Sequence, residues 1–171
     1  MNISRGKRMN EQEDIIQIRR ATADDVLSIA TVLHTAFIEY EHYYTHEAFA
    51  ATTPSAEGIR QRMSEGPTWV ALHNECIIGT VSAVVKGPLC YVRGMAILPT
   101  ARGQRIGARL LEHVEQFAAE QGADRLYLST ALFLERAVCL YERCGFERSE
   151  EEGALELFGT PVFMMVKRLG L

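Results

Sequence analysis

Glycines and arginines lie close together in residues 99–111, and residues of these types at this spacing can bind phosphate. An apolar run ends just before this stretch and apolar residues recur at helical spacing after it, which predicts a strand, a tight turn and a helix start. The first amides of a helix lack an internal acceptor, and the helix dipole adds partial positive charge there. Gly103 and Gly107 have no side chains, so an anion can approach the backbone closely. Full positive charge is added by three arginines: Arg102, Arg105 and Arg109. The stretch therefore predicts a pyrophosphate site.

The segments before this turn supply the elements that must position it. Residues 15–20 alternate weakly and predict a strand, and Thr22 with Asp25 three residues later is a capping box that opens a helix. A second, short helix is predicted over residues 55–63. Three β-rich runs follow in succession, which favours antiparallel pairing; they cover residues 69–73, 76–86 and 89–98.

The segments after the turn predict a mixed sheet. The helix that begins at the turn is expected to stop at Gly122, and an apolar strand follows over residues 126–129. A strand–helix–strand order implies a right-handed crossover and locally parallel pairing. A further helix over residues 133–144 precedes two closing strands at residues 146–148 and 162–169, with an acidic connection over 150–159. The expected fold class is α/β, with helices on both faces of the sheet.

Composition narrows the class of protein. A chain of 171 residues, with 47% hydrophobic and 23% charged residues, is typical of one domain with a real core. We expect a flexible tail over residues 1–14 and a single domain over 15–171. A formal net charge of −4 argues against a nucleic-acid-binding surface over the whole protein. No apolar run is long enough to cross a membrane and no signal peptide is visible, so we expect a cytoplasmic protein. The cysteines show no zinc spacing, and no metal site is predicted.

Two motifs identify a family. The segment Met95-Ala96-Ile97-x-Pro99-x-x-Arg102-Gly103-Gln104-Arg105-Ile106-Gly107 resembles the acetyl-CoA site of the GCN5-related N-acetyltransferase (GNAT) superfamily, [Q/R]-x-x-G-x-[G/A] after a strand. The segment Leu140-Tyr141-Glu142-Arg143-Cys144-Gly145-Phe146 resembles that family's later Y-E-x-x-G-F segment. The motifs occur in the family's order, and the closing residues 158–163 resemble a bacterial subgroup.

The resemblance implies a fold and a cosubstrate. The GNAT fold has a mixed, mostly antiparallel sheet of six to seven strands, helices on both faces and a splayed central strand. Acetyl-CoA is the implied cosubstrate, with no metal. The residues that the resemblance assigns to its binding are Met95, Ala96, Ile97, Arg102, Gly103, Gln104, Arg105, Ile106, Gly107, Ala108 and Tyr141.

The resemblance also implies direct transfer of the acetyl group to a primary amine in a ternary complex. Backbone amides around 95–97 would bind the carbonyl oxygen, and Tyr141 would protonate or hydrogen-bond the leaving thiolate. Glu39, Glu41 and His42 are alternative bases, among which we select Glu41. The residues expected to bind the acceptor, a small-molecule or peptide amine, are Glu39, His42, Tyr43, Tyr91 and Arg93. Both a monomer and a homodimer are left open.

Two residues depart from the family's pattern. Arg105 replaces a usual glycine; we expect its backbone to be sterically acceptable at a helix start and its side chain to reach a phosphate. Leu134 replaces an asparagine that contacts the CoA arm in many members. The alternative function is therefore a GNAT-like module that binds or senses acyl-CoA without turnover. A P-loop or a dinucleotide-binding loop is excluded because neither glycine pattern occurs.

Overall fold

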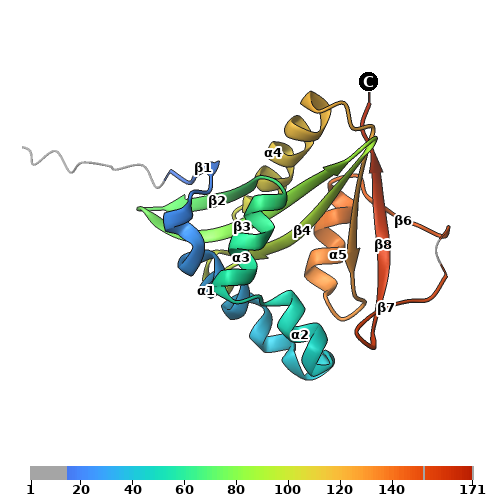
Figure 1. Ribbon diagram of the computed structural model, residues 1–171, viewed down its shortest axis with the longest axis horizontal. Coiled ribbons are helices and arrows are strands. Elements are labelled where there is room, and N and C mark those ends of the chain that lie inside the picture. The colour runs from blue at the N-terminus through green and yellow to red at the C-terminus, as the bar shows by residue number, and fades with distance from the viewer. Residues whose placement is uncertain (1–14, 152, 171) are drawn as a thin grey trace, which may run out of the picture.

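A computed structural model describes residues 15–151 and 153–170 (Figure 1); the predicted tail, residues 1–14, lies outside this range. The helices are η1 (Ala23–Asp25), α1 (Val26–Phe37), η2 (Ile38–Tyr43), α2 (His46–Thr52), α3 (Ala56–Glu65), η3 (Pro99–Ala101), α4 (Ile106–Glu120) and α5 (Glu135–Arg143), where η denotes a 3₁₀ helix. The strands are β1 (Gln17–Arg20), β2 (Thr68–His73), β3 (Cys76–Lys86), β4 (Leu89–Ile97), β5 (Arg125–Thr130), β6 (Glu147–Arg148), β7 (Leu155–Leu157) and β8 (Thr160–Arg168).

The sheet is mixed and splayed at its centre. Within the described residues its order is β1-β2-β3-β4-β5-β8-β6, with β7 paired to β8, and β4·β5 is the one parallel pair. That pair extends only from Leu89–Tyr91 to Arg125–Tyr127, and beyond it the two strands diverge (Figure 1). The predicted α/β GNAT fold, with its splayed central strand, is confirmed.

A bulge shapes β4 just before the turn. Thr80 pairs with Ala96 whereas Ser82 pairs with Arg93, so β4 uses one more residue than β3 between these two pairs. Gly94 lies in the bulge with a φ of 62°, a left-handed conformation that glycine adopts without steric cost. The bulge increases the local twist and re-aims the residues that follow it.

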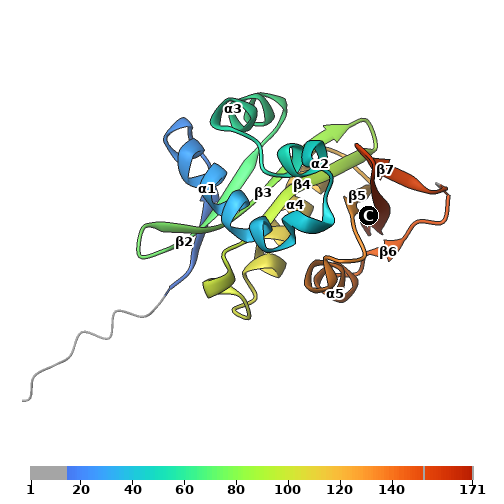
Figure 2. The ribbon, with the colours of Figure 1, turned by 90° about the horizontal axis from the view of Figure 1, so that it is seen from below.

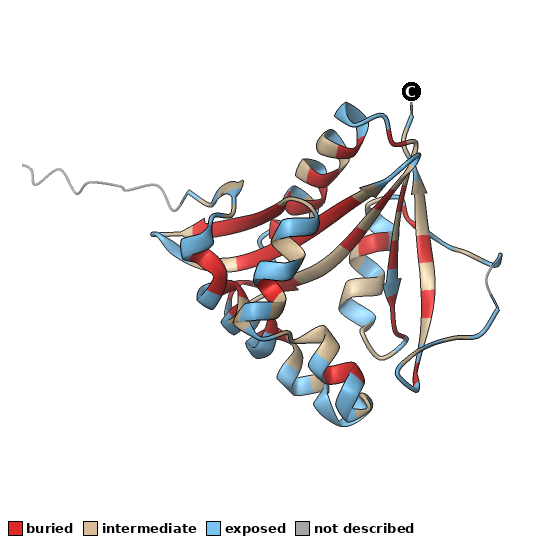
Figure 3. Cartoon of the chain, viewed as in Figure 1, coloured by how far each residue is buried: buried red, intermediate tan, exposed pale blue. Residues whose placement is uncertain are grey.

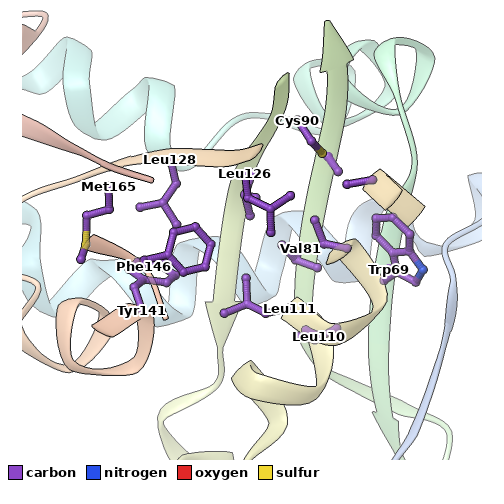
Figure 4. Packing of buried hydrophobic residues seen from close by; sticks show 14 of the residues in the cluster. Trp69, Val81, Cys90, Leu110, Leu111, Leu126, Leu128, Tyr141, Phe146 and Met165 are labelled. Atoms are coloured by element: carbon purple, nitrogen blue, oxygen red, sulfur yellow. The ribbon is translucent and has the colours of Figure 1, made fainter. Parts of the chain in front are cut away.

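Helices cover both faces of the sheet (Figure 2). On one face α4 and α5 pack over a core that includes Trp69, Leu111 and Tyr141 (Figure 4). On the other face α1 and α3 pack over a second core that includes Ile29, Leu33 and Val70. Strands β2 and β3 are buried along most of their length, whereas the described residues of the β6–β7 connection are largely exposed (Figure 3).

Two elements were not predicted, and long-range contacts account for both. The short helix α2 is capped by Thr45, whose hydroxyl accepts from the Ala48 amide and donates to the Phe158 carbonyl at 2.7 Å. The Thr45 amide also donates to Thr160 Oγ1 at 2.9 Å. Strand β7 lies in the expected acidic connection and forms a hairpin with β8 through a turn of two residues. These contacts tie α2 to the β7–β8 hairpin.

The predicted capping box is present, and it yields a pH-dependent contribution to stability. The Asp25 carboxylate accepts from Arg19 Nη1 at 2.7 Å and from the Thr22 amide at 2.7 Å. The hydrogen bond from Arg19 is the largest influence on the pKa of Asp25, which it holds below its ordinary value of 3.8. Because the pKa is lower in the folded state, this stabilisation is present above pH 3.8 and is lost as pH falls through the folded-state pKa.

Asp25→Asn should therefore lower the free energy of unfolding at pH 7 by about 1.5–3 kcal/mol, the usual value of a hydrogen bond to a charged group. The measurement is urea unfolding of both proteins from neutral to acidic pH. The gap between them should narrow below the unfolded-state pKa. A gap that stays constant or widens on acidification would show that the carboxylate's charge does not stabilise the helix start.

Candidate active site

A cavity of about 970 Å³ lies between the end of β4, the start of α4 and the side of α5. Tyr40 and the end of α1 close a further side of it. Nine of the predicted cosubstrate residues line it: Met95, Ala96, Ile97, Arg102, Gly103, Arg105, Ile106, Gly107 and Ala108. Gln104 and Tyr141 are not among the residues that form its wall.

The turn before α4 leaves a helix start open to this cavity. Gly103 has a φ of 84°, and a Cβ added there would meet no atom within 4 Å. Arg105 is the N-cap residue, and no side-chain hydrogen bond caps the helix. The amides of the first turn, at Ile106, Gly107 and Ala108, therefore have no helical acceptor and lie at the positive end of the dipole. The predicted cradle for an anion is formed by backbone groups.

The backbone of Arg105 differs from the expectation. Its φ and ψ are 59° and 19°, in the left-handed region, where a residue with a Cβ is strained by roughly 1–2 kcal/mol. The expectation of a sterically acceptable backbone is therefore wrong. This conformation explains why glycine suits the position, and Arg105 adopts it at a cost in stability.

Gly107 has a packing role in addition to the predicted one. A Cβ on Gly107 would lie 2.6 Å from Leu140 Cδ2, so the missing side chain lets α4 and α5 approach each other. Both residues line the cavity. A larger residue at this position would displace α5 as well as obstruct an anion.

The three arginines of the turn have different surroundings. Arg102 Nη2 donates to Glu39 Oε1 at 2.5 Å, and Arg109 Nη2 donates to the Ile16 carbonyl at 3.0 Å. Arg105 lines the cavity and forms no ion pair with a described residue. Two further arginines, Arg136 and Arg143, reach the cavity from α5 and were not predicted. Their spacing of seven residues places them on one face of a helix, a signal that the sequence contains.

Tyr141 lies at the boundary between the core and the splayed strands. Its side chain is 7% exposed and packs beside Phe146, with ring centroids 5.7 Å apart (Figure 4). Burial raises the pKa of its phenol well above the ordinary value, and the nearby phenols of Tyr44 and Tyr91 raise it further. The phenol is therefore neutral at physiological pH and can donate a hydrogen bond.

The predicted acceptor residues fall into two groups. On η2, Glu39 is ion-paired to Arg102, and Glu41, His42 and Tyr43 are exposed. Tyr43 stacks on Phe133 at 5.1 Å, which extends an aromatic wall beside the cavity residue Tyr40.

On the sheet, Tyr91 stacks on Tyr127 at 5.0 Å and Arg93 forms an ion pair with Glu65 of α3. Strand β4 itself has no acidic residue before its bulge, but Glu65 of α3 lies beside it. The proximity of Glu65 to β4 depends on tertiary packing and was not predicted. Tyr44, whose pKa burial raises to about 12, was also missed, although it lies in the aromatic run that ends the first helix.

Comparison with known proteins agrees with this geometry. The family model described as Acetyltransferase (GNAT) family matches residues 29–146. The chain belongs to this family. Escherichia coli N-acetyltransferase YjgM is 30% identical over 136 residues, which cover 76% of this chain and 81% of YjgM.

Two further relatives show the extent of the likeness. Aminoalkylphosphonate N-acetyltransferase of Salmonella typhimurium is 27% identical over 82% of this GNAT chain and 93% of its own length. The crystal structure of PaiA N-acetyltransferase from Thermoplasma acidophilum, in complex with coenzyme A, superposes with a TM-score of 0.75. It covers 91% of this chain and 99% of its own at 19% identity, which establishes a shared fold.

Family membership makes the GNAT chain an acetyltransferase.

No helix in the described part of the chain has the length and apolar character of a membrane crossing. Likewise, residues 15–151 and 153–170 contain no group of three or more metal-ligating side chains close together.

The strain at Arg105 can be separated from its charge with two substitutions. Arg105→Gly and Arg105→Ala both remove the guanidinium, but only glycine relieves the left-handed conformation. The Gly variant should be more stable than the Ala variant by about 0.5–1 kcal/mol, because glycine's larger unfolded-state entropy offsets part of the relief. Urea unfolding of the two variants measures this difference. An Ala variant as stable as the Gly variant would contradict the assigned backbone strain.

Proposed function

We propose that this chain is an acetyl-CoA-dependent N-acetyltransferase that transfers the acetyl group to a primary amine by direct attack in a ternary complex. A single domain over residues 15–171 would carry the activity. The observation that carries the proposal is the cavity. Its wall includes the uncapped start of α4 and also the end of β4, where β4 no longer pairs with β5.

The residues present fit acetyl-CoA. The amides of 106–108 suit the pyrophosphate, the bare Gly103 allows close approach, and Arg105 adds a full charge. Bound there, the cosubstrate supplies an activated acetyl thioester. Beyond Tyr91 the β5 side of β4 has no strand partner, so amides around Met95 and Ile97 are candidates to donate to the developing oxyanion. The coenzyme A held by the Thermoplasma protein of the same fold supports this assignment.

Tyr141 is proposed to assist the departure of the thiolate. An ordinary thiol has a pKa of about 8.5, far below the raised pKa of this phenol. Complete proton transfer from Tyr141 to the thiolate would therefore be unfavourable, and a hydrogen bond to the developing negative charge is the role that its chemistry supports. The proton can follow from solvent after the thiolate departs.

The base is proposed among residues of η2. The carboxylate of Glu39 already accepts from Arg102, which leaves Glu41 and His42 for deprotonating the incoming ammonium. We retain Glu41 as the proposed base and place the acceptor, a small-molecule or peptide amine, beside the aromatic residues of η2 and β4. The name of the Salmonella relative indicates an amine acceptor and supports this class.

The cosubstrate assignment predicts a loss of affinity in a defined variant. Arg105→Ala should weaken acetyl-CoA binding by about tenfold, since it removes a charge-assisted contact to a phosphate. Titration calorimetry measures the affinity, with Arg60→Ala of α3 as a control that removes an exposed arginine outside the cavity wall. Equal affinities in the two variants would contradict the assignment of Arg105.

The role of Tyr141 predicts a split between turnover and binding. Tyr141→Phe should lower kcat by roughly 10–100-fold, the loss of a hydrogen bond to charge, and leave the affinity for acetyl-CoA unchanged. Release of the CoA thiol during acetylation of a panel of primary amines measures kcat. Equal kcat in both proteins would remove Tyr141 from the chemistry. Acetyl-CoA binding without thiol release from any amine would favour the non-catalytic, acyl-CoA-sensing alternative.

A further inference from the structure

Two arginines from different elements meet on the face of β4 that lies opposite α4. Arg93 projects from β4, and its Nη2 donates to Glu65 Oε2 of α3 at 2.5 Å. Arg62 comes from α3, and its Nη2 donates to the Ala51 carbonyl at 2.7 Å. A Cβ added to Gly94 would lie 3.3 Å from Arg62 Nη1, so this guanidinium lies directly over the bulge of β4.

The pair carries more positive charge than its surroundings neutralise. Glu65 is the acidic residue that acts on both arginines, and it also attracts Lys86. Burial lowers the pKa of Arg62, and the neighbouring charge of Arg93 lowers it further. Arg93 Nε is buried and has no hydrogen-bond partner among the described residues. A buried guanidinium N–H without an acceptor is costly, and an oxyanion is the acceptor that suits its planar geometry.

The position of this pair relates it to the reaction. Gly94 immediately precedes the segment 95–97 along which the thioester is proposed to lie, and successive Cα atoms are about 3.8 Å apart. Tyr91 belongs to the last pair of residues before β4 and β5 diverge. Its phenol is near enough to Arg62 and Tyr141 to influence the pKa of each. Arg93 and the bulge under Arg62 therefore directly precede the segment on which the thioester is proposed to lie, and both arginines are on the face of β4 opposite α4.

We propose that Arg62 and Arg93 bind an oxyanion carried by the acceptor, so that the acceptors are small amino acids or aminophosphonates. This inference rests on the proposed acetyltransferase function and specifies its substrate class. Arginine binds carboxylate and phosphonate oxygens through paired N–H donors, and Arg93 Nε offers one that is already buried. The acid fixes the acceptor, and the amine then points toward the thioester.

Matched acceptors test the proposal through turnover. Glycine, β-alanine and aminomethylphosphonate are compared with glycinamide and β-alaninamide by CoA-thiol release, with kcat/KM expressed per concentration of neutral amine. The acids should exceed the amides by about tenfold. Arg62→Gln and Arg93→Gln should each lower kcat/KM for the acids far more than kcat/KM for the amides, which abolishes this preference. Arg60→Gln, on the same helix and exposed, should retain it. The carboxylate and phosphonate arms show which oxyanion is preferred, and amides or peptides that react as well as the acids would overturn the proposal.

A binding measurement keeps the inference independent of turnover. N-acetylglycine should bind the protein–CoA complex about tenfold more tightly than N-acetylglycinamide in calorimetry. Glu65→Gln should tighten binding of the acid, because it removes the carboxylate that competes for Arg93; a purely structural ion pair would not give this result. Glu65→Gln with Arg93→Gln keeps the local charge balanced and should lose the preference for the acid. Acid binding without turnover would reject the proposed function and retain the oxyanion site. Turnover without a preference for the acid would reject the oxyanion site and retain the proposed acetyltransferase function.

Discussion

The short parallel pairing of β4 and β5 is the constraint on which the rest of the structure depends. Three residues on each strand are in register, after which the strands separate and leave backbone groups of β4 without a strand partner. Such groups are costly to bury unless something else satisfies them. The bulge at Gly94 lies in this unpaired part and re-aims it, and the following turn starts α4 at the edge of the gap. An opening for a ligand is thereby built into the sheet.

The elements around the gap hold it open from both faces. On one face, Gly107 against Leu140 sets the spacing of α4 and α5, and Tyr141 projects from α5 into the boundary. On the other face, Thr45 fastens α2 to the β7–β8 hairpin. The ion pair between Arg102 and Glu39 links the turn to η2. The proposed donor site therefore lies between elements that contacts fix on both faces of the sheet.

Local spacing predicted most of the elements well, and the residues that the same spacing assigns to the donor site remain a proposal. The capping box, the three-strand meander, the glycine turn and the order of strand, helix and strand depend on neighbours in sequence, which patterns record. The left-handed backbone of Arg105 was not predicted. The family's motif shows that glycine is usual at this position, but it does not show that the backbone there is left-handed. Arg62 was not predicted, although it lies one helical turn after the buried Ile59. An arginine on the inward face of a helix requires a hydrogen-bonding or charged partner, and this requirement could have identified it. Three other omissions, α2, β7 and Glu65, depend on contacts between residues far apart in the sequence.

The central claim is that one cavity binds the pyrophosphate at the start of α4 and the thioester along β4. The most direct measurement is an amide NMR titration that compares acetyl-CoA with S-acetylpantetheine, which lacks the pyrophosphate. We predict that acetyl-CoA shifts the amides of Ile106–Ala108 and of Met95–Ile97, whereas S-acetylpantetheine shifts those of Met95–Ile97 alone. Unchanged amides at the start of α4 on binding acetyl-CoA would contradict the account.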